Sequence, residues 1–381
     1  MRLAILLGLL ICIATVHPIV GLCDDDVKQL FGYLPGGSDA KLFYWFFESR
    51  HDPIASPTLI FFQGGPGGSS MYSLTSGNGG PCILNRPGNG TSLNVYSYNT
   101  FANVMYIDQP SPTGFSEGGT PTDSVEAAKS TFLALSIFFN KYPIYNTAVF
   151  YIGQSYAGHF IPPLASFTCV YTGLHQYEGQ DNMQGRVKRI LEEVRGTSRP
   201  KKDQYVRVTY DLSKYCTEPP PECEYLENYP RYFNSKKVQR YLGVHKKWKL
   251  AEPEVDEAFN VDPLIDYSAD LAAILDGGLR VMIYAGDQDY ICNWIGNRDV
   301  SLGIQWSGHD GFSKANDEPC LLPNRKQYGE IRRFTSTITG GQLSFARIFK
   351  AGHNAAKDSP AGVLKLVSDF VMGRSLSQFV V

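Results

Sequence analysis

The chain has 381 residues, with 35 lysines and arginines against 37 aspartates and glutamates, so its formal net charge is −2 at neutral pH. This balance creates no strong field of one sign, which argues against nucleic acid or an anionic membrane as the partner. The length fits a single large α/β domain.

The amino-terminal residues are typical of an export leader. Arg2 supplies a positive start, residues 3–16 form a short apolar run, and Gly21-Leu22-Cys23 offers a small-residue cleavage site before three aspartates. A buried amino-terminal helix is the alternative. We predict a leader over residues 1–23 and a mature domain over residues 24–381, which is secreted or vacuolar/lysosomal. No later segment is long and apolar enough for a membrane anchor.

Export would allow disulfide formation and N-glycosylation. The cysteines beyond the leader should mostly be paired, in a connectivity that spacing leaves open; if Cys23 is retained, their odd number leaves one thiol free. Asn89-Gly90-Thr91 is the single N-glycosylation sequon, and its glycine-rich surroundings predict an exposed turn. Cysteine and histidine spacings suggest no metal ligands, so we expect neither a metal nor a cofactor.

Five short apolar runs, separated by turn residues, have the length of strands. Their nearly continuous apolar character is typical of strands buried on both faces of a parallel sheet. Residues 124–141 repeat apolar side chains at helical spacing. This alternation predicts an α/β fold, a mostly parallel central sheet flanked by helices, with active residues at the carboxyl ends of its strands. The runs are residues 58–62, 104–107, 148–152, 280–285 and 344–349.

Residues 168–229 break this rhythm. The segment is charged and contains three cysteines and a run of three prolines. We predict that it forms a short cap insertion over the sheet.

A candidate nucleophile follows the third apolar run. Gly153 and Ala157 flank Gln154, Ser155 and Tyr156, and a sharp strand-turn-helix elbow needs small residues at such positions. An ordinary turn is the alternative. A nucleophilic serine also requires a base and an acid that orients the base.

Both partners follow later strands. The fourth run leads into Asp287-Gln288-Asp289, and the fifth leads into Gly352-His353. The chain order serine, aspartate, histidine is one that serine hydrolases use. Asp287 competes with Asp289 for the role of the acid, and His353 by itself would be an ordinary surface histidine.

Several stretches together form a more specific signature. They are residues 63–70 (QGGPGGSS), 102–110 (ANVMYIDQP), 113–116 (TGFS), 154–159 (QSYAGH), 284–294 (YAGDQDYICNW) and 351–353 (AGH). On these stretches the chain resembles the serine carboxypeptidases, over residues 42–165 and again from residue 205 onward. The resemblance implies an α/β-hydrolase fold and peptide substrates that lose carboxy-terminal residues through an acyl-enzyme.

The resemblance also implies roles for single residues. It implies Ser155, Asp289 and His353 as the catalytic triad and the backbone N–H groups of Gly65 and Tyr156 as oxyanion donors. Glycine in the first loop allows close backbone approach, and a residue at a helix start has an unpaired N–H, so the oxyanion role has a physical basis as well. In some relatives the position of Cys292 holds an unpaired buried thiol, which makes Cys292 the candidate free cysteine.

The site departs from the family pattern where relatives bind the substrate carboxylate. Relatives use an asparagine and two glutamates that share a proton, whereas the matching positions here hold Gln63, Asn78 and Gln154. Shared-proton carboxyls bind an anion well only at acid pH, but amides do not titrate and still donate hydrogen bonds. We hypothesise that substrate binding here loses the usual acid dependence, while turnover still needs neutral His353.

A second departure concerns the core. Relatives carry a strand between the nucleophile strand and the acid strand, and no matching segment occurs between Ala165 and Tyr205. Residues 205–210 alternate in character and are one candidate replacement, but they resemble instead the stretch that precedes Cys216 in relatives. Without a replacement, two strand edges lose backbone partners. The alternatives to an active carboxypeptidase are therefore a catalytically impaired carboxypeptidase-like protein and a related esterase or acyltransferase.

Overall fold

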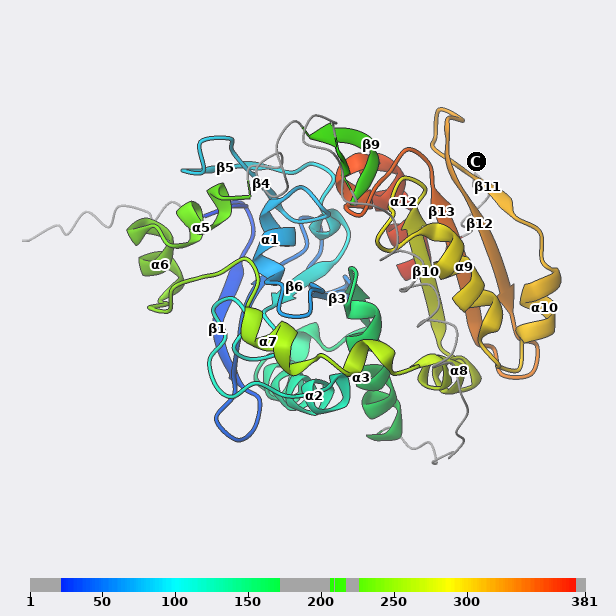
Figure 1. Ribbon diagram of the computed structural model, residues 1–381, viewed down its shortest axis with the longest axis horizontal. Coiled ribbons are helices and arrows are strands. Elements are labelled where there is room, and N and C mark those ends of the chain that lie inside the picture. The colour runs from blue at the N-terminus through cyan, green and yellow to red at the C-terminus, as the bar shows by residue number, and fades with distance from the viewer. Residues whose placement is uncertain (1–21, 172–205, 209, 217–225, 375–381) are drawn as a thin grey trace, which may run out of the picture.

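The molecule is built around two mixed β-sheets that lie side by side (Figure 1). The computed structural model describes residues 22–171, 206–208, 210–216 and 226–374. The first sheet has five strands in the order β1-β2-β6-β3-β7, and the second has four in the order β10-β13-β12-β11. The described strands are β1 (Gln29–Pro35), β2 (Lys41–Phe47), β3 (Thr58–Phe62), β4 (Cys82–Leu84), β5 (Thr91–Leu93), β6 (Asn103–Ile107), β7 (Val149–Gly153), β8 (Val206–Val208), β9 (Asp211–Cys216), β10 (Arg280–Gly286), β11 (Glu318–Leu321), β12 (Gln327–Thr335) and β13 (Gln342–Ile348).

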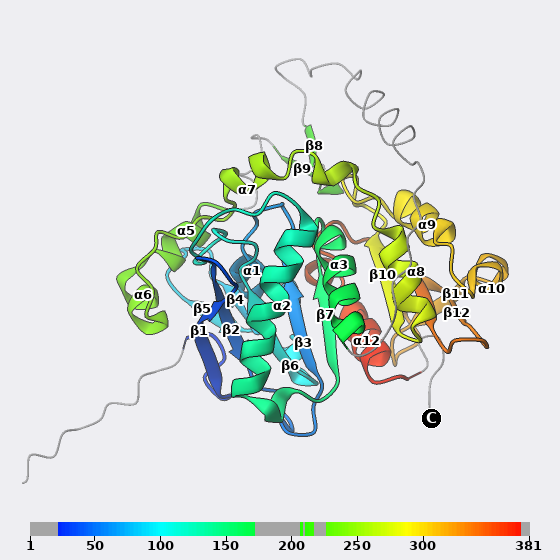
Figure 2. The same ribbon diagram turned by 90° about the horizontal axis from the view of Figure 1, so that it is seen from below.

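The helices cover the faces of the sheets. In Figure 2, α2 and α3 run along one face of the first sheet, and α9 and α10 lie beside the second. The described α-helices are α1 (Ser70–Thr75), α2 (Ser124–Lys141), α3 (Ala157–Tyr171), α5 (Asn228–Phe233), α6 (Lys236–Leu242), α7 (Pro253–Ala258), α8 (Ser268–Asp276), α9 (Trp294–Gly303), α10 (His309–Lys314), α11 (Ala355–Asp358) and α12 (Pro360–Val371).

The predicted elements agree closely with the observed ones. Strand β3 and helix α2 have the predicted bounds, and the other four predicted strands differ by one or two residues at their ends. The pairings β3–β6, β3–β7 and β10–β13 are parallel, as expected of an α/β fold. The outer pairings β1–β2, β2–β6, β11–β12 and β12–β13 are antiparallel. The parallel pairings therefore lie next to the boundary between the sheets and the antiparallel pairings lie farther out, so the α/β sheet is mixed and, among the described strands, divided.

Two apolar layers form on the faces of the first sheet, because alternate residues of a strand point to opposite sides. Trp45 and Phe61 belong to a layer shared with α12, whereas Phe46 and Phe62 pack toward α2 and α3. The rings of Phe46 and Phe138 of α2 lie 5.4 Å apart. This double burial explains why the sequence of these strands is apolar at successive positions.

The two sheets face each other across an unpaired boundary. Among the described residues, β7 pairs only with β3, and β10 pairs only with β13. Strands β3 and β6 are buried along their length, whereas every residue of β7 is only half-buried. The prediction of a missing central strand therefore agrees with the described part of the chain. Strand β8 does not fill the gap, because it pairs with β9 in a separate hairpin that ends at Cys216.

Side chains and helices connect the sheets across this boundary. Ser166 Oγ in α3 donates a 2.7 Å hydrogen bond to Asp270 Oδ1 in α8. At the start of β10, the guanidinium of Arg280 lies 5.6 Å from the ring centroid of Phe150 in β7. Packing and a cation–π contact here replace a continuous ladder of backbone hydrogen bonds.

The structure bears on the predicted leader, the cysteines and the cap insertion. Cys23 forms a disulfide with Cys82, so a leader that ended at residue 23 would remove a cysteine of the folded domain. Cys292 is free, as expected, and Cys320 is free as well. Most of the predicted cap insertion lies outside the described residues. Within the described ranges, no helix has the length and apolar character needed to span a bilayer.

Candidate active site

Ser155 lies on a sharp turn between β7 and α3. Its φ of 60° is in the left-handed region, which is unfavourable for a residue with a side chain and is typical of a nucleophile elbow. A Cβ on Gly153 would lie 2.5 Å from the Cβ of Ala157, so only glycine lets the helix begin this close to the strand. The predicted requirement for small residues around the serine is confirmed by this geometry.

His353 and Asp289 meet at the ends of β13 and β10. Asp289 is buried, and its Oδ2 lies 2.8 Å from Nδ1 of His353. Its Oδ1 accepts hydrogen bonds from the backbone N–H groups of Ile291 and Cys292 at 3.0 and 3.1 Å. The carboxylate is thus held so that one oxygen faces the imidazole. Asp287, the competing acid, instead accepts from the N–H of Lys350 at 2.7 Å.

The environment shifts the proton affinity of His353. Burial of the ring lowers its pKa, but hydrogen bonds with Asp289 and with Cys292 outweigh burial and raise the pKa of His353 to about 9. The imidazole therefore holds its proton in the free protein at neutral pH.

Cys292 lies between the serine and the histidine. Its Sγ is 3.9 Å from Ser155 Oγ, and its sulfur lies with the nearest donor atoms of Asp289 and His353 inside a cluster no wider than 4.8 Å. Among the described hydrogen bonds, none joins Ser155 Oγ to His353. The hydroxyl and the imidazole thus border the same thiol. The three side chains Asp289, Cys292 and His353 also form a donor set that could hold a metal ion, which the sequence did not suggest.

The first glycine loop approaches the nucleophile turn closely. A Cβ on Gly64 would lie 2.4 Å from the backbone nitrogen of Tyr156, so the loop touches the start of α3. Gly65 has a φ of 124°, which favours glycine. The N–H groups of Gly65 and Tyr156 donate to no described residue. Two free backbone donors beside a serine are suited to an oxyanion.

The three predicted carboxylate-binding residues meet in one amide cluster. Gln154 Oε1 accepts from Asn78 Nδ2 at 2.9 Å and from Gln63 Nε2 at 3.3 Å. Gln154 Nε2 donates to the carbonyl oxygen of His353 at 2.8 Å and to Asn354 Oδ1 at 3.0 Å. Both N–H groups of Gln154 are therefore in use, whereas Gln63 and Asn78 each retain one that donates to no described residue. Ser73 also belongs to the cluster, because its hydroxyl donates to Gln63 Oε1 at 2.5 Å. This role was not predicted, because Ser73 lies in no sequence motif.

The carboxylate of Asp262, which was not predicted, holds the side chain of Tyr156. The hydroxyl of Tyr156 donates to Asp262 Oδ2 at 2.5 Å, and Asp262 also accepts from Ser124 and Tyr267. Burial raises the pKa of Asp262. The His159 ring, whose Nδ1 lies 3.6 Å from Oδ2, and hydrogen bonds from Ser124 and Tyr156 outweigh burial and hold the pKa well below its usual range. No sequence signal marks Asp262, because it lies far from every motif.

The chain is similar in sequence and in fold to known proteins. The family profile described as serine carboxypeptidase matches residues 22–187 and 168–373. The chain is 30% identical to carboxypeptidase Y homolog A of Trichophyton equinum over 414 residues, which covers 92% of this chain and 75% of the relative. It is also 30% identical to carboxypeptidase Y homolog A of Neurospora crassa, over 93% of this chain and 74% of the relative.

A solved structure shares the fold. KEX1(delta)p, a prohormone-processing carboxypeptidase from Saccharomyces cerevisiae, superposes with a TM-score of 0.75 over 93% of this chain and 94% of that chain, at 18% identity. The predicted α/β-hydrolase fold is therefore confirmed.

Proposed function

The chain belongs to the serine carboxypeptidase family and is a serine-type hydrolase of that kind, and we propose that Ser155, His353 and Asp289 perform its reaction. The observation that carries this proposal is the 2.8 Å contact between His353 Nδ1 and Asp289 Oδ2, with Ser155 on a strained turn beside the same cluster. An acid that fixes one imidazole nitrogen leaves the other free to accept a proton from the serine.

The proposed reaction releases the carboxy-terminal residue of a peptide. Ser155 Oγ attacks the last peptide carbonyl, and His353 takes the hydroxyl proton and passes it to the leaving amine. The N–H groups of Gly65 and Tyr156 donate hydrogen bonds to the carbonyl oxygen and stabilise the negative charge that forms there. Water then attacks the acyl carbonyl while His353 takes its proton. The bond to Ser155 Oγ breaks, the proton passes from His353 to that oxygen, and the shortened peptide leaves with a new carboxylate. Because His353 must be neutral to act, activity rises toward the pKa of about 9.

Substrate orientation is proposed to depend on the amide cluster. The unused N–H groups of Gln63 and Asn78 are suited to donate to the substrate carboxylate, while Gln154 orients both amides and has no N–H left. Since none of these groups titrates, the affinity for the substrate carboxylate should stay constant over the pH range in which a pair of glutamates would lose its shared proton.

We further propose a location in the secretory pathway, secreted or vacuolar/lysosomal, with a leader that ends before Cys23. The disulfide between Cys23 and Cys82 supports this, because such bonds persist in oxidising compartments.

A fluorophosphonate probe tests the proposal. Wild-type protein and a Ser136→Ala control are expected to be labelled and to cleave a blocked dipeptide, whereas Ser155→Ala should do neither. Labelling with cleavage of esters alone would favour the esterase or acyltransferase alternative. Absence of labelling in folded wild-type protein would favour the catalytically impaired alternative and contradict the proposal.

A further inference from the structure

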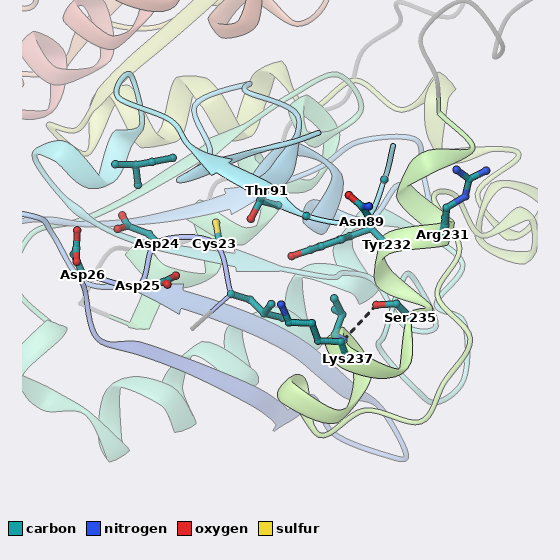
Figure 3. Close-up of a pocket in the computed structure, with 15 residues that line it drawn as sticks. Cys23, Asp24, Asp25, Asp26, Asn89, Thr91, Arg231, Tyr232, Ser235 and Lys237 are labelled. Carbon is teal, nitrogen blue, oxygen red and sulfur yellow. Dashed lines mark hydrogen bonds between the residues drawn. The ribbon is translucent and has the colours of Figure 1, made fainter. Parts of the chain in front are cut away.

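A cavity lies away from the triad. It has a volume of about 610 Å³ and is lined by the segment before β1, the β4–β5 hairpin and helices α5 and α6 (Figure 3). No part of the proposed reaction uses this cavity. Its lining combines apolar side chains with acidic, basic and hydroxyl groups, which include Asp25, Ser235 and Lys237.

A buried phenol lines this cavity. The side chain of Tyr232, from α5, is 3% exposed, and its hydroxyl meets no described residue in a hydrogen bond of normal geometry. Burial raises the pKa of Tyr232 to about 12, against the opposing effect of the nearby Thr91 hydroxyl. The phenol therefore stays protonated, and a buried O–H without a partner costs free energy unless a ligand accepts from it.

The only sequon of the chain lies on the rim of the same cavity. Asn89 and Thr91 both line it, and Figure 3 shows both among the lining residues, together with Tyr232. Asn85 fixes the turn, because its Oδ1 accepts from the N–H of Asn89 at 3.1 Å and its Nδ2 donates to Asn89 Oδ1 at 2.9 Å. The Nδ2 of Asn89, which is the atom that carries an N-linked sugar, donates to no described residue.

The hairpin turn is also anchored to helix α5. Asn228 Nδ2 donates to the carbonyl of Arg86 at 2.8 Å, and Arg231 Nη1 donates to that of Pro87 at 3.2 Å. A Cβ on Gly88 would lie 3.0 Å from Asn228. A group attached to Asn89 would thus be held at a fixed place relative to Tyr232.

We propose that the cavity holds the first N-acetylglucosamine units of a glycan linked to Asn89, with the hydroxyl of Tyr232 donating to a sugar oxygen. Sugars present hydroxyl and acetamide groups for polar side chains and an apolar face for an aromatic ring, and the lining offers both kinds of contact. The inference rests on the secretory location proposed above, because N-glycans are added to exported chains.

Protection of the glycan core tests the inference. The full-length chain is expressed in a eukaryotic secretory host, and native and denatured samples are treated with an endoglycosidase that cuts between the two core sugars. Mass spectrometry of the glycopeptide should find Asn89 occupied, with cleavage at least about tenfold slower in the native protein than after denaturation. Tyr232→Phe, which removes only the hydroxyl, should remove most of this protection, since one hydrogen bond is worth about a factor of ten.

A second sequon provides the matched control. Thr337→Asn completes a sequon with Ile338 and Thr339 on the turn between β12 and β13, where Ile338 is 80% exposed. Its glycan should be cut equally fast in native and denatured protein. If position 337 is glycosylated and Asn89 is bare, or if the Asn89 glycan is cut as fast as the control, the inference is overturned and the proposed location stands. If neither site carries sugar, both proposals fail, while fluorophosphonate labelling still tests the triad separately.

Discussion

Gln154 and His353 connect the two sheets at the active-site edge, because Gln154 Nε2 donates a 2.8 Å hydrogen bond to the carbonyl oxygen of His353. Gln154 follows β7 of the first sheet, and His353 follows β13 of the second. The carboxamide of Gln154 therefore belongs to the amide cluster and also fixes the backbone of His353, the proposed base. Position 154 links substrate binding to the geometry of the triad.

Gln154→Glu should restore acid dependence to substrate binding. A carboxylate at this position would face both the carbonyl of His353 and the substrate carboxylate, so ionisation would repel both. We expect KM of the variant to rise about tenfold between pH 5 and pH 8, equivalent to about 1.4 kcal/mol, while wild-type KM stays nearly constant. Steady-state kinetics on a blocked dipeptide measure this, with Gln305→Glu on the surface as the control. A steep rise in wild-type KM would contradict the role of the amides.

Cys292→Ala should shift the pH profile toward acid. The thiol raises the pKa of His353, so its removal lowers that pKa and makes the neutral imidazole available at lower pH. We expect the lower limb of the kcat/KM profile to move down by about one pH unit. Cys320→Ala, at a buried thiol in another part of the fold, is the matched control. An unchanged limb in the Cys292 variant would show that the thiol does not influence the base.

Asp262→Asn should destabilise the protein in a pH-dependent manner. The folded-state pKa of Asp262 is lowered, so its carboxylate stabilises the fold above the unfolded pKa near 4, and this stabilisation is lost as pH falls. Loss of the negative charge that accepts four hydrogen bonds, from Ser124, Tyr156 and Tyr267, should lower the free energy of unfolding by about 2 to 4 kcal/mol at pH 7. Urea unfolding at pH 7 and pH 3 measures the difference, which should shrink at pH 3. Asp266→Asn, at an exposed position, should change neither value.

The sequence predicted most of what local rules determine. Strand β3 and helix α2 follow directly from apolar periodicity. The approach of Ser155, Asp289 and His353 to one another follows from their places after three apolar strands. Asp262 could not be predicted, because its role arises when a loop far along the chain folds against Tyr156. The division of the sheet was visible only as an absent motif, and no periodicity could show what would connect the two edges.

The unpaired boundary leads to the last prediction. In a parallel strand with one neighbour, alternate N–H groups point away from that neighbour and lack a ladder partner. Strand β6 pairs on both sides, with β2 and β3, whereas β7 and β10 each pair on one side among the described strands. Their outward amides should therefore exchange with solvent through small local openings, although both strands lie in the middle of the fold.

Native-state hydrogen exchange measures this directly. We expect the outward amides of Val149–Gly153 and Arg280–Gly286 to exchange at least about tenfold faster than those of Asn103–Ile107, which serve as the internal control. Arg280→Met, which removes the guanidinium over Phe150, should increase the exchange of β7 further while leaving β6 unchanged. Exchange of β7 and β10 as slow as that of β6 would mean that another segment pairs with both edges, and the two-sheet description would then be wrong.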